Sequence, residues 1–107
     1  MTVVTAPKLD LKDFADRAAH ASQLLKALAN QNRLMLLCEL LEAGEMNVSA
    51  LSEAIGLSQS ALSQHLARMR EEGLVATRRD GQTIYYRVGT PNVARVIGTL
   101  RDIFCNP

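Results

Sequence analysis

The segment from Leu57 to Val75 constrains the fold of this chain most strongly, because it reads as a complete helix with a start and a stop. Ser58 has the side-chain oxygen of an N-cap residue, and Gly73 can adopt the left-handed conformation that closes a helix. The apolar residues between them recur at spacings of four and three, which predicts one buried stripe. This stripe consists of Leu62, Leu66 and Met69.

The opposite face of this helix is rich in side chains that hydrogen-bond in two directions or carry a fixed positive charge. They are Gln59, Ser60, Ser63, Gln64 and Arg68. In the major groove of DNA, glutamine can pair with adenine, and arginine can pair with guanine or phosphate. We therefore expect this helix to enter the major groove of double-stranded DNA.

Both flanks of this helix favour the same interpretation. Asn47 to Ile55 reads as a short helix capped by Asn47, and Gly56-Leu57 makes the tight turn of a helix-turn-helix. Residues 75–79 and 83–88 read as strands around Asp80-Gly81, a strong hairpin signal. The predicted fold is mainly α with a β-hairpin wing, a winged helix-turn-helix. The alternative is an αα-hairpin and a β-hairpin that only pack together.

Three further helices are predicted outside this unit. The first covers residues 9–29 and has a heptad-like apolar seam, which suits packing along a partner helix. The second covers residues 33–43 and is apolar on more than one side, which places it at the centre of the fold. The last opens at Thr90-Pro91, a cap followed by a first-turn proline. The seam comprises Leu11, Phe14, Ala18, Ala21, Leu25 and Leu28, and the stripe of the last helix comprises Val93, Val96, Ile97, Leu100 and Phe104.

The predicted element order is therefore α-α-α-α-β-β-α, in one domain over residues 9–107. Residues 1–8 have no periodic pattern and are expected to form a flexible tail. The first and last helices are the expected surface of a homodimer. A small core rich in leucine and alanine is often completed by dimerisation.

Composition limits the classes of function. The net charge is only +1 over 107 residues, so a DNA footprint must be confined to one face. Between Ser58 and Thr90 the charged residues are five arginines and three acids, and arginine is the usual choice for binding phosphate and bases. No segment has the length and apolarity of a membrane span or a signal peptide. We expect a cytoplasmic protein with no membrane partner.

The chain resembles the ArsR/SmtB family of small winged-helix transcriptional repressors over nearly its whole length. The stretches that carry the resemblance are residues 24–29, 32–34, 48–51, 57–66, 73–75 and 81–86. The resemblance implies a homodimer that binds operator DNA and releases it when an inducer binds. It also implies that Gln59, Ser60, Ser63, Gln64 and Arg68 face DNA, that Arg78, Arg79 and Gln82 contact the DNA backbone from the wing, and that His65 is structural.

Many relatives in this family sense metals, and here the sequence departs from them. Their cysteine pair on the first helix of the helix-turn-helix has no counterpart in residues 45–50. Their zinc ligands on the last helix are missing too, because residues 92–104 contain no histidine and only one acid, Asp102. We therefore expect neither a typical metal site nor a cofactor.

The two cysteines are the remaining candidates for chemistry. Considered singly, Cys38 is a buried small hydrophobe and Cys105 an incidental exposed thiol. Together they resemble the sulfide- and redox-responsive subgroup of the family, the BigR, SqrR and HlyU proteins. The resemblance implies that Cys38 and Cys105 form a switch, in which reactive sulfur species (persulfide or polysulfide) or oxidants link the two thiols and release the DNA.

Three alternatives stay open. The same repressor could sense a soft metal or arsenite through the two thiols, although two ligands are few for a dedicated site. A thiol oxidoreductase would need a close pair such as Cys-x-x-Cys, or a cysteine with a placed histidine, and the sequence has neither, so we expect no enzyme. A winged helix used only for protein contacts would retain no DNA.

Overall fold

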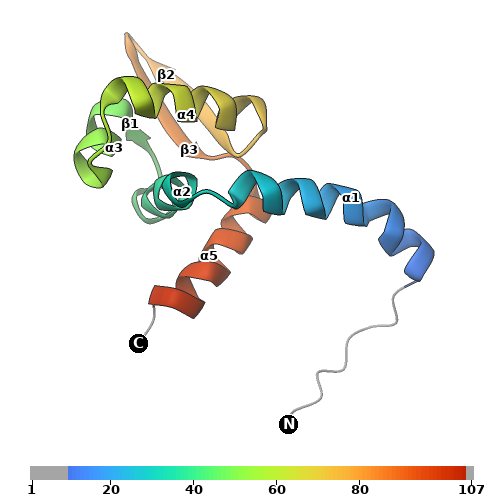
Figure 1. Ribbon diagram of the computed structural model, residues 1–107. Coiled ribbons are helices and arrows are strands. Elements are labelled where there is room, and N and C mark those ends of the chain that lie inside the picture. Colours follow the sequence, from blue (N-terminus) through green and yellow to red (C-terminus); the bar gives the residue numbers. More distant parts are fainter. Residues whose placement is uncertain (1–9, 106–107) are drawn as a thin grey trace.

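The computed structural model describes residues 10–105, and the tail expected over residues 1–8 lies outside these described residues. The helices are α1 (Leu11–Leu28), α2 (Gln31–Ala43), α3 (Val48–Ile55), α4 (Gln59–Glu71) and α5 (Pro91–Cys105) (Figure 1). The strands are β1 (Met46–Asn47), β2 (Val75–Asp80) and β3 (Thr83–Val88). The predicted winged helix-turn-helix is confirmed. Within residues 10–105, no helix is long and apolar enough to cross a membrane.

The structure adds one strand to the predicted order. The two residues of β1 pair antiparallel with β3, with Met46 opposite Tyr86 and Asn47 opposite Tyr85. The sheet order is β1-β3-β2, so the second strand of the wing is the central strand of the sheet. Two residues are too few to show the alternation by which a strand is predicted. The observed order is therefore α-α-β-α-α-β-β-α.

Helix α2 forms the centre of the core, as its apolar composition predicted. Its residues Leu36, Leu37 and Leu40 are fully buried, and α2 packs against α3, β3 and α5. The helix-turn-helix and its neighbours contribute the other fully buried side chains: Leu51, Leu62, Leu66, Met69, Leu74 and Ile97. Because the α4 stripe is anchored in this core, the opposite face of α4 is left to the solvent.

The ends of α4 lie where the sequence predicts them. The Ser58 hydroxyl accepts a hydrogen bond from the backbone N–H of Ala61 at 3.2 Å. At the other end, Gly73 has a φ of 76°, and the N–H of Leu74 donates to the carbonyl of Met69 at 2.8 Å. This pairing is a Schellman closure, which satisfies the last carbonyls of the helix. The closure turns the chain directly from α4 into the wing.

The wing is a regular hairpin over residues 75–88, in which Val75 faces Val88 and Asp80 faces Thr83. Its two turn residues are therefore Gly81 and Gln82, one position later than the predicted Asp80-Gly81. Gly81 has a φ of 63°. Glycine adopts this conformation without strain, and tight hairpins commonly use it.

The base of the wing is closed by backbone contacts. Gly89 donates its N–H to the carbonyl of Leu74 at 2.9 Å. A side chain at Gly89 would overlap the carbonyl oxygen of Gly73. The strand that leaves the wing is therefore fixed directly against the end of α4.

The terminal helices behave differently from each other. Helix α5 packs on α2, with Val93 and Ile97 buried. Helix α1 projects away from the rest of the molecule (Figure 1), and Leu28 is its one buried residue. Most of the predicted α1 seam is therefore exposed in the single chain.

Candidate DNA interface and thiol pair

All five polar residues predicted to read DNA from α4 are exposed. They project from a helix whose other face is anchored by fully buried leucines, so their positions are set by the core and not by a loop. Gln59 also donates a hydrogen bond from Nε2 to the Ser49 hydroxyl of α3 at 3.4 Å. This bond links the two helices of the helix-turn-helix at the start of α4.

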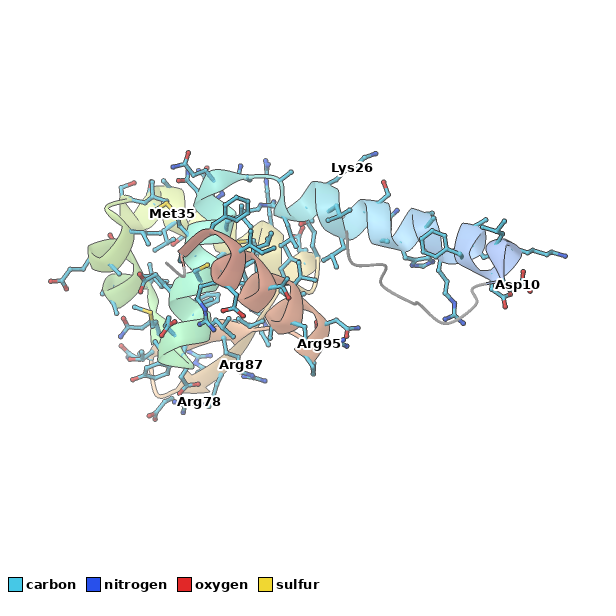
Figure 2. All side chains as sticks on the ribbon, turned by 90° about the horizontal axis from the view of Figure 1, so that it is seen from below. Asp10, Lys26, Met35, Arg78, Arg87 and Arg95 are labelled. Carbon is cyan, nitrogen blue, oxygen red and sulfur yellow. The ribbon has the colours of Figure 1, made fainter. Side chains whose placement is uncertain are left out.

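The two wing arginines lie on opposite faces of the hairpin. Arg78 faces Tyr85 across the strands, whereas Arg79 faces Ile84. Successive side chains in a strand point to opposite sides. Arg79 therefore shares the face of Tyr86 and Val88, which pack against the core, and Arg78 shares the outer face. Figure 2 shows Arg78 and Arg87 together on this outer side.

The Arg78 side chain is bound by other residues of the same chain. Its guanidinium donates to the Glu45 carboxylate, with Nη2 and Oε1 2.5 Å apart, and it lies 4.7 Å from the centre of the Tyr85 ring. The hydrogen bonds from Arg78 hold the pKa of Glu45 below its usual range. A phosphate would have to compete with this carboxylate for Arg78. No local sequence pattern predicts the contact, because Glu45 and Arg78 are 33 residues apart.

Arg79 and Gln82 lie nearer the tip of the wing, and both are exposed. Arg79 donates from Nε to the carbonyl of Gly81 at 3.0 Å, which folds its side chain along the turn. Among residues 10–105 it has no acidic partner within ion-pair distance. Of the two arginines predicted to contact DNA from the wing, Arg79 is therefore the one whose charge is not already matched by a carboxylate.

A groove of about 890 Å³ lies between α1 and the flank of α4, and it was not predicted from the sequence. Gln64 and Arg68 line it from α4, together with His65, which is half-buried as expected of a structural residue. Lys26 and Arg33 line it from the end of α1 and the start of α2. These residues come from three separate segments, so no local pattern could have revealed the groove.

The two cysteines lie on α2 and α5, two helices that pack against each other. Arg101 of α5 pairs with Glu42 of α2, with Nη1 and Oε1 2.6 Å apart. Cys105 lies one turn further along α5 from Arg101, and Cys38 lies one turn back along α2 from Glu42. Each cysteine therefore lies one turn from a residue that joins the two helices. Both thiols are free.

The environments of the two thiols differ. Burial raises the pKa of the Cys38 thiol, and the negative charge of Cys105 raises it further, while Arg101 opposes the shift. The two thiols are therefore close enough for the charge of one to act on the other. Cys38 is half-buried, whereas Cys105 is exposed. The thiolate is the reactive form of cysteine, so Cys38 is disfavoured as the first thiol to react.

The thiol pair is remote from the DNA-facing residues. Cys105 ends α5 on the side of the molecule away from α4 and the wing (Figure 1). Among residues 10–105, no group of three or more histidine, cysteine or acidic side chains could hold a metal ion. Any influence of the thiols on α4 must therefore act over a distance, for example through the packing of α5 on α2 and β3.

Comparison with known protein families assigns this architecture. Residues 30–77 match the family described as "Bacterial regulatory protein, arsR family". The chain is 42% identical to the transcriptional activator HlyU of Vibrio cholerae, over 98% of this chain and 96% of that protein. It is also 42% identical to the biofilm growth-associated repressor of Xylella fastidiosa, over 94% of this chain and 88% of that protein.

Solved structures give the same result. The reduced HlyU of Vibrio cholerae superposes with a TM-score of 0.82 at 44% identity, covering 89% of this chain and 99% of that one. The transcriptional repressor BigR of Xylella fastidiosa superposes with a TM-score of 0.82 at 40% identity, covering 92% of this chain and 100% of that one. The similarity therefore extends well beyond the helix-turn-helix.

The two thiols should differ in reactivity. With limiting iodoacetamide at pH 7.5, we expect Cys105 to be alkylated before Cys38, because Cys105 is exposed and Cys38 is half-buried with a raised pKa. Each unit by which the Cys38 pKa is raised lowers its thiolate fraction about tenfold at this pH. Peptide mapping by mass spectrometry after short reaction times measures both rates.

The pH dependence of the Cys38 alkylation rate tests whether its raised pKa causes the slow reaction. Because the Cys38 pKa lies above the ordinary thiol value, its alkylation rate should still be rising above pH 9. Equal rates for the two cysteines at pH 7.5, or faster alkylation of Cys38, would contradict the expected order of reactivity.

Proposed function

Because this chain belongs to the arsR family of bacterial regulatory proteins, we propose that it is a homodimeric repressor whose operator DNA is released when reactive sulfur species or oxidants link Cys38 and Cys105. The observation that carries the proposal is the position of the two cysteines, which are far apart in the sequence but lie on α2 and α5, two helices that pack against each other. One of the similar structures is described as a reduced HlyU, which names a redox state for that relative.

The DNA-binding part of the proposal rests on α4 and the wing. Five exposed polar side chains project from a helix that is fixed by its buried stripe. In a winged helix-turn-helix this second helix lies in the major groove. Arg79 and Gln82 are exposed near the tip of the wing, where we expect them to meet phosphates beside the groove, whereas Arg78 would have to leave Glu45 to do so.

The proposed chemistry has two steps. The exposed Cys105 thiolate attacks the sulfane sulfur of a low-molecular-weight persulfide, RSSH. The attack forms the Cys105 persulfide and releases the thiolate RS⁻. Cys38 then loses its proton and attacks the inner sulfur of that persulfide, which forms the Cys38–Cys105 disulfide and releases hydrosulfide. A peroxide would act through sulfenic acid at Cys105, with water released when Cys38 closes the disulfide.

The bridge would reach the DNA through the dimer. It would hold the end of α5 against α2, near the Arg101–Glu42 ion pair. We propose that α5 also belongs to the dimer surface, so that a change in α5 alters the separation of the two recognition helices. Dimeric readers tolerate little change in half-site spacing. A coupling of about 1–3 kcal/mol is typical of allosteric proteins.

The dimer part of the proposal rests on exposed apolar side chains on the two terminal helices. Leu11 is 81% exposed, Leu25 63% and Phe104 79%. Helix α1 has 18 residues and projects from the body of the molecule. In proteins most of the stability of a helix comes from the packing of its apolar face, and the α1 seam is largely unpacked in the single chain. A second copy of the chain would cover both surfaces and place two α4 helices side by side on a palindromic operator.

A soft-metal or arsenite sensor is a second candidate. The AntR antimony-specific transcriptional repressor superposes with a TM-score of 0.75 at 32% identity, covering 80% of this chain and 78% of that one. Release of DNA by arsenite or antimonite, but not by persulfide, would favour this candidate over the sulfur switch.

Base reading and phosphate contact can be separated by substitution. Gln64→Ala should weaken binding to a duplex selected by the protein by about 1–3 kcal/mol, because a bidentate base contact is lost, and should change binding to a scrambled duplex little. Arg79→Ala should weaken binding to both duplexes. It should also reduce the slope of log K against log salt by about 0.9 for each protomer.

Arg78→Ala is the matched control for Arg79, since Glu45 already pairs with Arg78, and it should flatten the salt dependence less. Fluorescence anisotropy over a salt series measures all three variants. An unchanged ratio of specific to non-specific affinity in Gln64→Ala would reject its base-reading role.

The dimer surface can be tested with a buried charge. Leu25→Asp or Leu100→Asp should give monomers that lose operator binding, because a carboxylate would be buried in the interface. Ala19→Asp places the same charge on α1 off the seam and should leave the dimer intact. Sedimentation velocity measures the mass of each variant. A monomeric wild type would overturn the proposed assembly.

The switch itself is tested with Cys38→Ser and Cys105→Ser. Each should bind operator DNA like the wild type, because neither thiol lies on α4 or the wing. Each should stay bound after persulfide treatment, whereas the wild type should be released and should recover with dithiothreitol. Mass spectrometry should find Cys38 joined to Cys105 within one chain of the treated wild type. Release of the double serine variant by the same treatment would place the inducer site elsewhere.

A further inference from the structure

We infer that the groove between α1 and α4 is a second contact surface for the DNA backbone, in which Lys26 meets a phosphate beside the recognition helix. This inference rests on the proposed DNA-binding function and extends it to a helix outside the helix-turn-helix and the wing. The observations that support it are the charge of the groove, the position of the groove along α4, and the bonds that join the end of α1 to the end of α4.

The groove has an excess of positive charge. Its lining contains three cations, Lys26, Arg33 and Arg68, and a single carboxylate, Glu72. Arg33 neutralises that carboxylate, with Nη1 and Oε2 2.7 Å apart. Over residues 10–105, neither Lys26 nor Arg68 has an acid within ion-pair distance. Two positive charges therefore remain for an anionic partner.

The groove lies along the recognition helix itself. Gln64 and Arg68 line the groove and also belong to the polar face that is expected to meet DNA. A recognition helix in the major groove has a phosphate backbone on either side, because the groove is only about 12 Å wide. Figure 1 shows the wing and α1 on different sides of α4. The wing is thus placed toward one backbone, and the end of α1 toward the other.

The end of α1, which carries Lys26, is joined to the end of α4 by Arg33. Arg33 donates from Nη1 to the carbonyl of Ala27 at 3.0 Å as well as to Glu72, which follows the end of α4. The Arg33 side chain is only 12% exposed, so the link that it makes between the end of α1 and the end of α4 is partly shielded from water. Lys26, in the last turn of α1, precedes the bonded Ala27 and extends into solvent (Figure 2). The backbone beside Lys26 is therefore fixed, while its exposed side chain is free to meet a phosphate.

The chemistry of the groove fits a polyanion better than a small anion. The available cations, Lys26 and Arg68, are both exposed, so a single anion between them would remain largely hydrated. A DNA backbone brings many phosphates at once, and each contact releases condensed counterions. A backbone held by several contacts gains affinity from one exposed lysine, whereas a free phosphate gains little.

The test compares two lysines of the same helix. Lys26→Gln removes the charge in the groove, and Lys12→Gln removes an exposed charge 14 positions earlier in α1. This separation is about 21 Å along the helix axis. Binding of each variant to a protein-selected duplex and to a scrambled duplex is measured by fluorescence anisotropy over a salt series.

Lys26→Gln should flatten the dependence of log K on log salt by about 0.9 for each bound protomer, equally for both duplexes, and Lys12→Gln should not. A fourfold rise in salt would then weaken the variant about 3.5-fold less per protomer than the wild type. Lys26→Arg should keep the wild-type slope, which controls for damage to the α1–α2 corner.

A wild-type slope in Lys26→Gln would overturn the inference, and so would a loss confined to the selected duplex. Equal flattening by Lys12→Gln would also overturn it, because the effect would then come from the net charge of the chain. If the wild type binds neither duplex, the proposed DNA-binding function itself fails, which is a different result from any of these.

Discussion

Burial of the α2 leucines is the interaction on which the rest of this structure depends. Leu36, Leu37 and Leu40 are fully buried, and the helix that carries them contacts α3, β3 and α5. The helix-turn-helix, the wing and the helix that ends in Cys105 are thus supported by one element. Protein interiors are close-packed and transmit strain. A change at the contact between α5 and α2 therefore has a direct physical route to the DNA-facing side, with α2 as the shared support.

The parts of the fold that depend on local interactions were predicted well from the sequence. Ser58, Asn47 and Thr90 were each expected to cap a helix, and each side chain accepts a hydrogen bond from the backbone N–H three residues later. The left-handed closure at Gly73 was likewise expected and observed. Caps and closures involve neighbours within a few positions, so the sequence contains all the information they need.

The parts that depend on distant residues were not predicted. Strand β1 exists because the edge of β3 is available to it, and two residues show no pattern of their own. Arg78 and Arg79 were expected to act alike, although they lie on opposite faces and Glu45 holds only Arg78. The pairing of Cys38 with Cys105 was expected only by resemblance to a family. The structure adds a physical basis for that expectation, because the two cysteines lie on α2 and α5, which pack against each other.

The closed base of the wing has a consequence for how such a domain can diversify. Gly89 approaches the backbone of Gly73 so closely that no side chain fits, and it is hydrogen-bonded to the carbonyl of Leu74. The angle between the hairpin and the recognition helix is therefore fixed by main-chain atoms at its root. Beyond that root, the strands could be lengthened by residue pairs or given a different turn without altering this angle. The tip of the wing can therefore change to suit a new DNA site while the backbone contacts at its base stay the same.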